Sequence, residues 1–344
     1  MSDILFIKTS SLGDVIHHMP ALTEARRQRP QARLSWVVEE AFAPLVRIHP
    51  AVSAVIPIAS RRWRGTLAAP STWGEIAGFA RAVRARSYDE VIDTQGLLRS
   101  AVVARLAHGH RHGYDASSIR EPAAAWFYDV KHRVARGLHA ITRNRMLTGL
   151  ALGYVPDGST DFGLSRNEIR TTSAAAYGIL FHATARAEKE WPEAAWIALG
   201  RVLAARGGSL LLPWGSEAEH VRSKRIAVEV ANARVPERQP LDRMAALIAG
   251  ASFVIGVDTG LIHLAAALGV PLVAIFTASE PGLTGPMGSG PIAVVETTDE
   301  LACRPCHKPV CQLGHHRCMR EISVDRVAMM IRQTIAGPLQ RTSI

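Results

Sequence analysis

Residues 4–30 read ILFIKTSSLGDVIHHMPALTEARRQRP, and this stretch decides the fold. The apolar run at 4–7 predicts a buried β-strand, and a short polar loop follows it at 9–14. Residues 15–29 then predict a helix that ends before Pro30. A strand, a loop and a helix in this order form the first part of a βαβ unit, whose strands run parallel.

The same order recurs through the rest of the chain. Further strands are expected at 34–38, 52–58, 90–93, 177–182, 209–212, 253–257 and 272–276. Further helices are expected at 75–86, 191–206, 222–232, 261–268 and 325–334. Strands that alternate with helices favour parallel sheets with helices on both faces. The predicted fold class is therefore α/β, with two doubly wound, Rossmann-like domains facing a cleft.

The length and a linker-like segment at 154–159 predict the domain boundary. A chain of 344 residues is long enough for two domains with separate cores. We expect an N-terminal domain at 1–158 and a C-terminal domain at 159–344, with the last helix as a candidate to pack back on the first domain. The loop after the first strand has one glycine, Gly13, and lacks the G-x-G-x-x-G pattern, which argues against a dinucleotide-dependent oxidoreductase.

The charge balance favours an anionic partner. The chain has 40 Lys and Arg against 30 Asp and Glu, which suits nucleic acid, an anionic membrane surface or a phosphorylated substrate. Aromatic residues make up 6% and no nucleic-acid-binding motif is present, so nucleic acid is not an expected partner. No apolar run is long enough to span a bilayer and the N-terminus lacks a basic leader. We therefore expect a cytoplasmic protein with at most peripheral membrane contact.

Two loops after predicted strands contain candidate catalytic residues. Asp14 lies at the start of a helix, where it is either a general base for an attacking hydroxyl or a helix cap. Lys189 follows the strand at 177–182, near Thr184 and Arg186, and either neutralises charge on a leaving phosphate or belongs to a solvated loop. Ligands of open α/β sheets bind beyond the carboxyl ends of strands, so both loops are candidate parts of a site.

A third turn has the features of an anion site. Asp258, Thr259 and Gly260 follow the strand at 253–257 and begin a helix, whose free N–H groups and dipole suit a diphosphate. His263 lies four residues after Thr259 and therefore shares a helix face with it. The alternative is that Asp258 caps the helix and His263 packs inside the protein.

Basic residues of the first half form the candidate acceptor site. Arg61, Arg62 and Arg64 follow a predicted strand, and Lys8 and Arg120 are candidate companions. Guanidinium groups suit phosphate and carboxylate recognition. The alternative is an ordinary solvated basic loop.

The four cysteines lie close together in the sequence, with the spacing C-x2-C-x4-C-x6-C and with His307, His315 and His316 nearby. They are Cys303, Cys306, Cys311 and Cys318. This spacing suits a structural zinc or iron site, and the alternative is a set of inert thiols. A structural disulfide is not expected in a cytoplasmic protein.

Several segments in a fixed order resemble the lipopolysaccharide heptosyltransferase I family, nearly from end to end. They are IKTSSLGDV at 7–15, WVVEE at 36–40, RRWR at 61–64, VIDTQGL at 91–97, REP at 120–122, HAT at 182–184, KEWP at 189–192, LPWG at 212–215 and VDTGL at 257–261. The resemblance implies a GT-B fold with an N-terminal acceptor-binding domain and a C-terminal nucleotide-sugar-binding domain. It also implies inverting transfer of L-glycero-D-manno-heptose from ADP-heptose to a Kdo residue of Kdo2-lipid A, without a catalytic metal.

The resemblance also implies roles for single residues. Asp14 takes the position of the base, and Lys189 takes that of a lysine at the donor phosphates. The donor-binding positions are Thr184, Ala185, Lys189, Glu219, Gln239, Asp258, Thr259, Gly260 and His263, with Ala185 where the family has a second threonine and Gln239 near the adenine. A sister heptosyltransferase, another GT-B sugar transferase and a non-catalytic polyanion-binding protein are the alternative functions.

Overall fold

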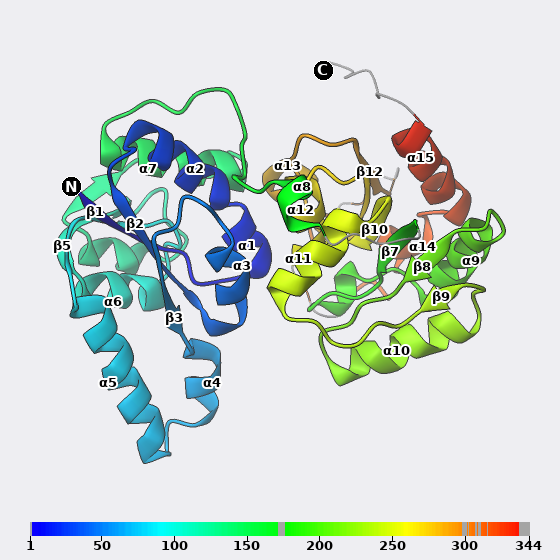
Figure 1. Cartoon of the computed structure of the whole chain (residues 1–344), viewed down its shortest axis with the longest axis horizontal. Coiled ribbons are helices and arrows are strands. Elements are labelled where there is room, and N and C mark those ends of the chain that lie inside the picture. Colours follow the sequence, from blue (N-terminus) through cyan, green and yellow to red (C-terminus); the bar gives the residue numbers. More distant parts are fainter. Residues whose placement is uncertain are drawn as a thin grey trace. The chain divides into compact units, whose positions relative to one another are not determined.

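The computed structural model describes residues 2–336 except 171–175, 298–300, 302, 307, 309, 310 and 315. The chain divides into two compact units, Met1–Leu164 and Ser165–Ile344, a few residues after the predicted boundary. Each unit contains one six-stranded sheet in which all paired strands run parallel (Figure 1). In the described part of the chain, no helix is long and apolar enough to cross a membrane.

The sheet of the first unit has the strand order β3-β2-β1-β4-β5-β6. Its strands are β1 (Asp3–Ile7), β2 (Arg33–Glu39), β3 (Ala54–Ile58), β4 (Ser87–Asp93), β5 (His108–Tyr114) and β6 (Val130–His132). Its helices are α1 (Leu12–Ile16), α2 (Met19–Gln28), α3 (Ala43–Arg47), α4 (Ser60–Gly65), α5 (Pro70–Arg84), α6 (Leu98–Leu106) and α7 (Ala140–Leu152), with 3₁₀ helices η1 (Glu40–Phe42) and η2 (Pro122–Phe127). The order β3-β2-β1-β4-β5-β6 is that of a doubly wound sheet.

One local prediction for this unit is wrong, and so is one alternative interpretation. The single helix expected at 15–29 is two helices, α1 and α2. Pro20 lies in the first turn of α2, where its missing N–H is tolerated, and inside one continuous helix its ring would collide with the carbonyl four residues earlier. The run that contains Arg61, Arg62 and Arg64 is the helix α4 and not a loop.

The sheet of the second unit has the order β12-β11-β10-β7-β8-β9. Its strands are β7 (Tyr177–Phe181), β8 (Ser209–Leu211), β9 (Ala233–Arg234), β10 (Phe253–Val257), β11 (Leu272–Phe276) and β12 (Ile292–Glu296). Its helices are α8 (Arg166–Ile169), α9 (Glu193–Ala204), α10 (Glu217–Val228), α11 (Leu241–Gly250), α12 (Gly260–Ala267), α13 (Pro281–Thr284), α14 (Arg317–Arg320) and α15 (Val324–Ala336), with the 3₁₀ helix η3 (Ala187–Lys189). The helix expected at 222–232 starts earlier, because Ser216 and Glu219 form a capping box at the start of α10.

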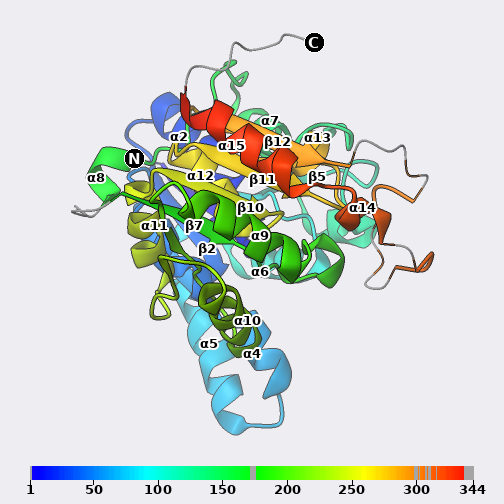
Figure 2. The same cartoon turned by 90° about the vertical axis from the view of Figure 1, so that its right-hand side faces the viewer.

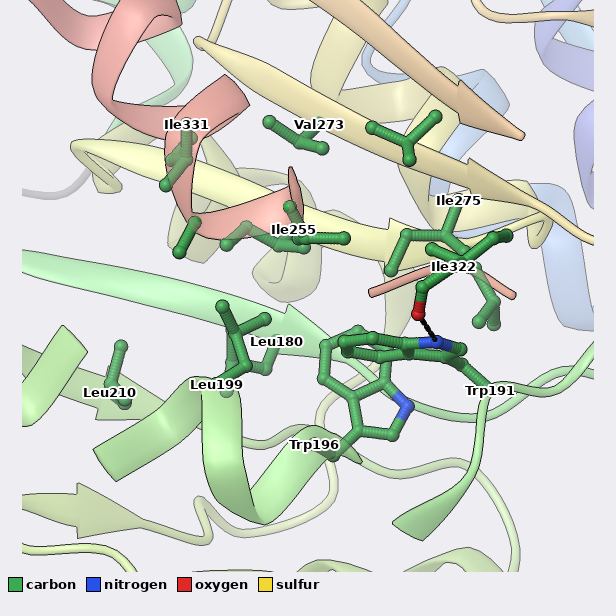
Figure 3. Close-up of a cluster of buried hydrophobic side chains, with 14 of the residues drawn as sticks. Leu180, Trp191, Trp196, Leu199, Leu210, Ile255, Val273, Ile275, Ile322 and Ile331 are labelled. Atoms are coloured by element: carbon green, nitrogen blue, oxygen red, sulfur yellow. Dashed lines mark hydrogen bonds between the residues drawn. The ribbon is translucent and has the colours of Figure 1, made fainter. Parts of the chain in front are cut away.

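A tryptophan-centred core fixes the segment that follows β7. Trp191 and Trp196 are fully buried and meet edge to face, with ring centroids 5.3 Å apart. Figure 3 shows Trp191 donating its indole N–H to the carbonyl of Ile322, over 3.1 Å. Because Trp191 follows η3 by two residues, this core anchors the short segment that carries Lys189.

The last helix completes the same core. α15 packs against α9, β11 and β12 of the second unit, as Figure 2 also shows. Its buried residues Val327 and Ile331 belong to the cluster around Trp191. The prediction that this helix packs back on the first unit stays a prediction.

Candidate functional site

The loops after β7 and β10 meet because these strands are neighbours in the sheet, with Phe181 paired to Gly256. Lys189 from the first loop lies 2.5 Å from Asp258 in the second, measured from Nζ to Oδ2. Thr184 donates its hydroxyl to the backbone carbonyl of Asp258, over 2.9 Å. The structure therefore brings Thr184, Lys189 and Asp258 together, as the resemblance implies for a donor site.

Asp258 is the centre of a buried polar network. His263 Nε2 lies 3.8 Å from its Oδ1, and Ser279 donates a hydroxyl hydrogen bond to its Oδ2. Burial alone would raise the pKa of Asp258, but the hydrogen bond from His263 and the charge and hydrogen bond of Lys189 hold it well below its usual range. The carboxylate is therefore ionised at neutral pH and holds its cationic partner in a fixed place.

The start of α12 differs from the simple capping alternative. Thr259, not Asp258, is the N-cap residue, and its side chain makes no capping hydrogen bond. Gly260 is the first residue of the helix, and His263 is buried one turn later. The hydroxyl of Thr259 and the first-turn N–H groups thus form the polar end of a helix beside Lys189 and Asp258, which suits an anion.

A cavity of about 750 Å³ lies next to this network. Thr184, Ala185 and Glu219 line it, and Thr184 therefore links the cavity to Asp258. Sites for small molecules and cofactors usually have volumes of about 300–1,000 Å³, so the cavity is large enough for a nucleotide. Lys189, Asp258, Thr259, Gly260 and His263 are not among its lining residues.

Two arginines of the cavity wall were not expected from the sequence. Arg222 and Arg225 line it from α10 and form ion pairs with Glu190 and Glu193, at 2.6 Å in each case. Arg222 also donates to the carbonyl of Trp191, over 2.7 Å, which ties the wall to the core. Their spacing of three residues, after an S-x-x-E capping signal, is the feature of the sequence that would have indicated them.

The two remaining donor positions differ in their surroundings. The Oε2 of Glu219 accepts hydrogen bonds from the backbone N–H groups of Gly215, over 2.6 Å, and Ser216, over 3.3 Å. Glu219 therefore shapes the loop that borders the cavity. Gln239 lies outside the cavity wall and bonds the carbonyl of Glu237 over 3.2 Å.

In the first unit, Asp14 occupies the third position of α1 and Ser11 is the N-cap. The Oδ2 of Asp14 accepts both the backbone N–H of Ser11, over 2.7 Å, and its hydroxyl, over 3.0 Å. The side chain is partly exposed. Asp14 is thus part of the helix cap, and this contact also fixes the orientation of its carboxylate.

Lys8 is buried, and its ammonium donates to the carbonyl of Thr94 over 3.0 Å and to Asn144 Oδ1 over 3.5 Å. Burial lowers the pKa of Lys8, while the nearby charges of Asp14 and Asp93 oppose that shift. The cation therefore lies within electrostatic reach of Asp14 and inside the unit.

A second cavity, of about 400 Å³, lies in the first unit and contains Arg120. Arg99 also lines it and donates to the hydroxyl of Ser10 over 2.7 Å, so this cavity adjoins the loop that leads to Asp14. Arg99 was not expected from the sequence, although it lies two residues after the VIDTQGL motif.

The arginines of α4 have partners within their own unit. Arg62 forms ion pairs with Glu40 at 3.1 Å and Glu75 at 2.8 Å. Hydrogen bonds to these two carboxylates raise its pKa above its usual range. Arg61 stacks on Phe42 at 5.1 Å from the ring centroid, and Arg64 is exposed.

The side chains of the four cysteines are partly buried. Burial raises the pKa of the Cys318 thiol, and the neighbouring Cys303, Cys311 and Cys306 raise it further, which places all four in one region. Within the described residues, no three of their sulfur atoms lie within 4.8 Å of one another. His307 and His315 lie outside the described residues, and a metal at the cysteines stays a prediction.

The proteins to which this chain is similar are heptosyltransferases. A family model described as glycosyltransferase family 9 (heptosyltransferase) matches residues 76–316. The chain is 44% identical over 311 residues to lipopolysaccharide heptosyltransferase 1 of Pseudomonas aeruginosa, covering 90% of this chain and 87% of that protein. It also resembles the solved E. coli heptosyltransferase WaaC with ADP (TM-score 0.86, 38% identity) and with ADP-2-deoxy-2-fluoro heptose (TM-score 0.83, 37% identity). Each of these two matches covers 96% of this chain and 99% of the chain in the solved structure.

Proposed function

Because the chain belongs to glycosyltransferase family 9, the heptosyltransferases, we infer that it transfers L-glycero-D-manno-heptose from ADP-heptose to a Kdo residue of Kdo2-lipid A. This reaction belongs to the assembly of the lipopolysaccharide inner core. The two-domain α/β architecture is that of the GT-B glycosyltransferases. The observation that carries the assignment most directly is the Thr184–Lys189–Asp258 network beside a nucleotide-sized cavity.

We propose that the second unit binds the donor. The cavity lined by Thr184, Ala185 and Glu219 receives the ADP moiety, and the diphosphate meets Lys189 and the Thr259–Gly260 turn. Asp258 is a positioning residue here, since its buried carboxylate holds Lys189 and His263 in place. A fixed cation and a helix N-terminus stabilise negative charge that grows on a leaving phosphate.

Asp14 acts as the general base in this proposal. Its carboxylate takes the proton of the acceptor hydroxyl as the oxygen attacks the anomeric carbon of the heptose. The bond from that carbon to the ADP oxygen breaks, and ADP leaves with the electron pair toward Lys189. Attack opposite the leaving group inverts the anomeric centre. The capping contact with Ser11 orients the carboxylate for this role.

The acceptor contacts are proposed for the first unit. Arg120 and Arg99 line a cavity next to the loop of Asp14, and their guanidinium groups suit the carboxylates of Kdo or the phosphates of lipid A. Arg61, Arg62 and Arg64 on α4 are proposed as further acceptor contacts in the same unit. Lys8 contributes its charge from inside the unit.

We place the reaction at the cytoplasmic face of the inner membrane, where a lipid acceptor is accessible to a protein with a net charge of +10. Catalysis needs no metal in this account, because Lys189 and the start of α12 meet the diphosphate. A zinc or iron ion at Cys303, Cys306, Cys311 and Cys318 would have a structural role only.

ADP release tests the assignment when the acceptor is varied. The protein is incubated with ADP-heptose and either Kdo2-lipid A or the same acceptor that already carries one heptose. We expect ADP release and a mass gain of one heptose with Kdo2-lipid A alone. Release only with the heptosylated acceptor would identify a sister transferase, and no release with either would favour the polyanion-binding alternative.

A further inference from the structure

Histidine and glutamate side chains that have no role in the proposed transfer gather on the sheet of the first unit. The parallel strands β4 and β5 pair Glu90 with His110 and Ile92 with His112. Because side chains alternate between the two faces of a strand, His110 and His112 share one face. Glu90, directly beside His110, joins them there.

The ligand atoms of this cluster lie close together. Those of Glu90, His110 and His112 are all within 4.8 Å of one another, and no other such group of three occurs among the described His, Cys, Asp and Glu residues. The Nε2 of His112 lies 2.6 Å from Oε2 of Glu90. On its other side, Nδ1 of His112 lies 3.0 Å from Nε2 of His132 on β6, and the two rings stack.

The three residues differ in their exposure to solvent. His112 is buried, Glu90 is partly buried and His110 is exposed. A cation therefore has an entry from solvent at His110 and a fixed ligand at His112. Solvent at the exposed side supplies the remaining coordination position.

We propose that Glu90, His110 and His112 form a binding site for a divalent transition-metal ion, and that Zn²⁺ is the ion that this donor set fits best. Two imidazoles and one carboxylate are a known zinc ligand set, whereas Mg²⁺ and Ca²⁺ prefer oxygen ligands. Bonds of about 2.0–2.2 Å in a tetrahedron put the ligand atoms roughly 3.3 Å apart. His112 Nε2 and Glu90 Oε2 are 2.6 Å apart and no pair of ligand atoms is more than 4.8 Å apart, so movements of about 1.5 Å or less bring the three to that spacing.

His132 orients the buried ligand. When Nε2 of His112 binds the metal, its Nδ1 carries the proton and donates it to Nε2 of His132. The ion thereby joins β4 and β5 directly and reaches the edge strand β6 through this hydrogen bond. Its effect is structural, because a ligand that binds only the folded state stabilises that state.

A cobalt titration of the full chain without an affinity tag tests this site. Co²⁺ is a spectroscopic substitute for Zn²⁺, and bound by imidazole and carboxylate it gives d–d bands without the thiolate charge-transfer band of a cysteine site. We expect these d–d bands for the wild-type protein, with or without a thiolate band from the cysteines, and their loss when Zn²⁺ is added in excess. The thermal unfolding midpoint should rise in Zn²⁺.

Four variants locate the ligands. His110→Ala and Glu90→Gln should each weaken Co²⁺ binding at least about 10-fold, and His132→Ala should weaken it by roughly 10- to 100-fold. His108→Ala is the matched control, because His108 is exposed on the same strand and lies outside the cluster. It should bind like the wild type. His110 is exposed, so His110→Ala should fold normally, and its metal-free unfolding midpoint checks this.

Two results would overturn the proposal. One is an unchanged cobalt spectrum and affinity in both His110→Ala and Glu90→Gln. The other is a wild-type spectrum that consists of the thiolate band alone, since this would assign all bound metal to the cysteines. Neither result bears on heptose transfer, which is measured separately by ADP release.

Discussion

Asp258 and its partners in the proposed donor region are buried or partly buried and joined to one another, whereas the arginines of α4 in the proposed acceptor region are exposed. Asp258 contacts Lys189 and His263 inside the second unit. Arg62, on α4 of the first unit, pairs with two exposed carboxylates. The chain therefore has a largely buried ion pair in one unit and solvent-exposed ion pairs in the other.

This difference has an energetic meaning. Breaking a buried pair leaves an uncompensated charge and is costly, while an exposed pair contributes only about 0–1 kcal/mol. In the proposed donor region, Asp258 thus holds the ammonium group of Lys189 in place without any ligand. Arg62 of α4 can exchange its two carboxylate partners for an anionic acceptor at little cost. Substitutions should therefore have large effects at the donor network and small effects on α4.

The largest expected effect belongs to Asp14, the one residue of the first unit placed at the chemistry. Asp14→Asn removes the base, but its amide oxygen still accepts the hydrogen bonds of Ser11. Turnover should fall ~10²–10⁴-fold, the usual contribution of a general base. Ser11→Ala is the control for capping, because it weakens the cap and keeps the base. Near-wild-type turnover in Asp14→Asn would leave Asp14 with the helix cap as its only role.

Lys189→Met should have the next largest effect. The substitution keeps the length of the side chain and removes the charge that faces the leaving phosphate. Turnover should fall by roughly 10²–10³-fold, by analogy with the loss of one preorganised oxyanion donor, and donor affinity should fall as well. Arg225→Met, on an exposed arginine of the cavity wall, is a matched control with a smaller expected loss. Equal kinetics for Lys189→Met and wild type would place Lys189 outside the site.

The ionised Asp258 network should make the free energy of unfolding depend on pH. The pKa of Asp258 is lowered in the folded protein, so its stabilising contribution is present above the unfolded value of about 3.9 and is lost as the pH falls below it. Asp258→Asn should cost about 1–3 kcal/mol of unfolding free energy at pH 7. The difference in unfolding free energy between Asp258→Asn and wild type, measured by denaturant titration, should become smaller below about pH 4. A difference that does not depend on pH would contradict the ionised network.

Substitution of the arginines of α4 should change the acceptor KM and not the donor KM. Replacing Arg61, Arg62 and Arg64 together with alanine should raise the acceptor KM several-fold and leave the donor KM unchanged, more strongly at low salt because exposed charges are screened. Arg62→Ala alone should do less than Arg64→Ala, since Arg62 is already paired with Glu40 and Glu75. A change in the donor KM alone would reverse the assignment of the two units.

The smallest expected effect is that of a chelator on turnover. Activity should survive excess EDTA, because Lys189 and the start of α12 replace a cation at the diphosphate. The measurement is the rate of ADP release before and after dialysis against EDTA. Recovery of a lost rate by Mg²⁺ or Mn²⁺ would contradict this account, and recovery by zinc or iron alone would indicate a structural metal.

The sequence predicts the apolar strands β1 and β10, but it misses β12 although IAVVE is apolar. It also misses β5, because HGHRHGY has no apolar alternation and forms a strand only between β4 and β6. Among site residues, Lys189 and Asp258 follow from their motifs. Arg99 and Arg222 do not, because their importance depends on which cavity they line after folding.

We propose that the second unit binds the donor and that the first unit supplies the base. The dissociation constant of ADP-heptose tests this assignment most directly. Calorimetric titration of ADP-heptose into wild type, Asp14→Asn and Lys189→Met needs no acceptor and no turnover. We expect a wild-type dissociation constant for Asp14→Asn and a clearly larger one for Lys189→Met. Weaker donor binding in Asp14→Asn together with unchanged binding in Lys189→Met would contradict this assignment.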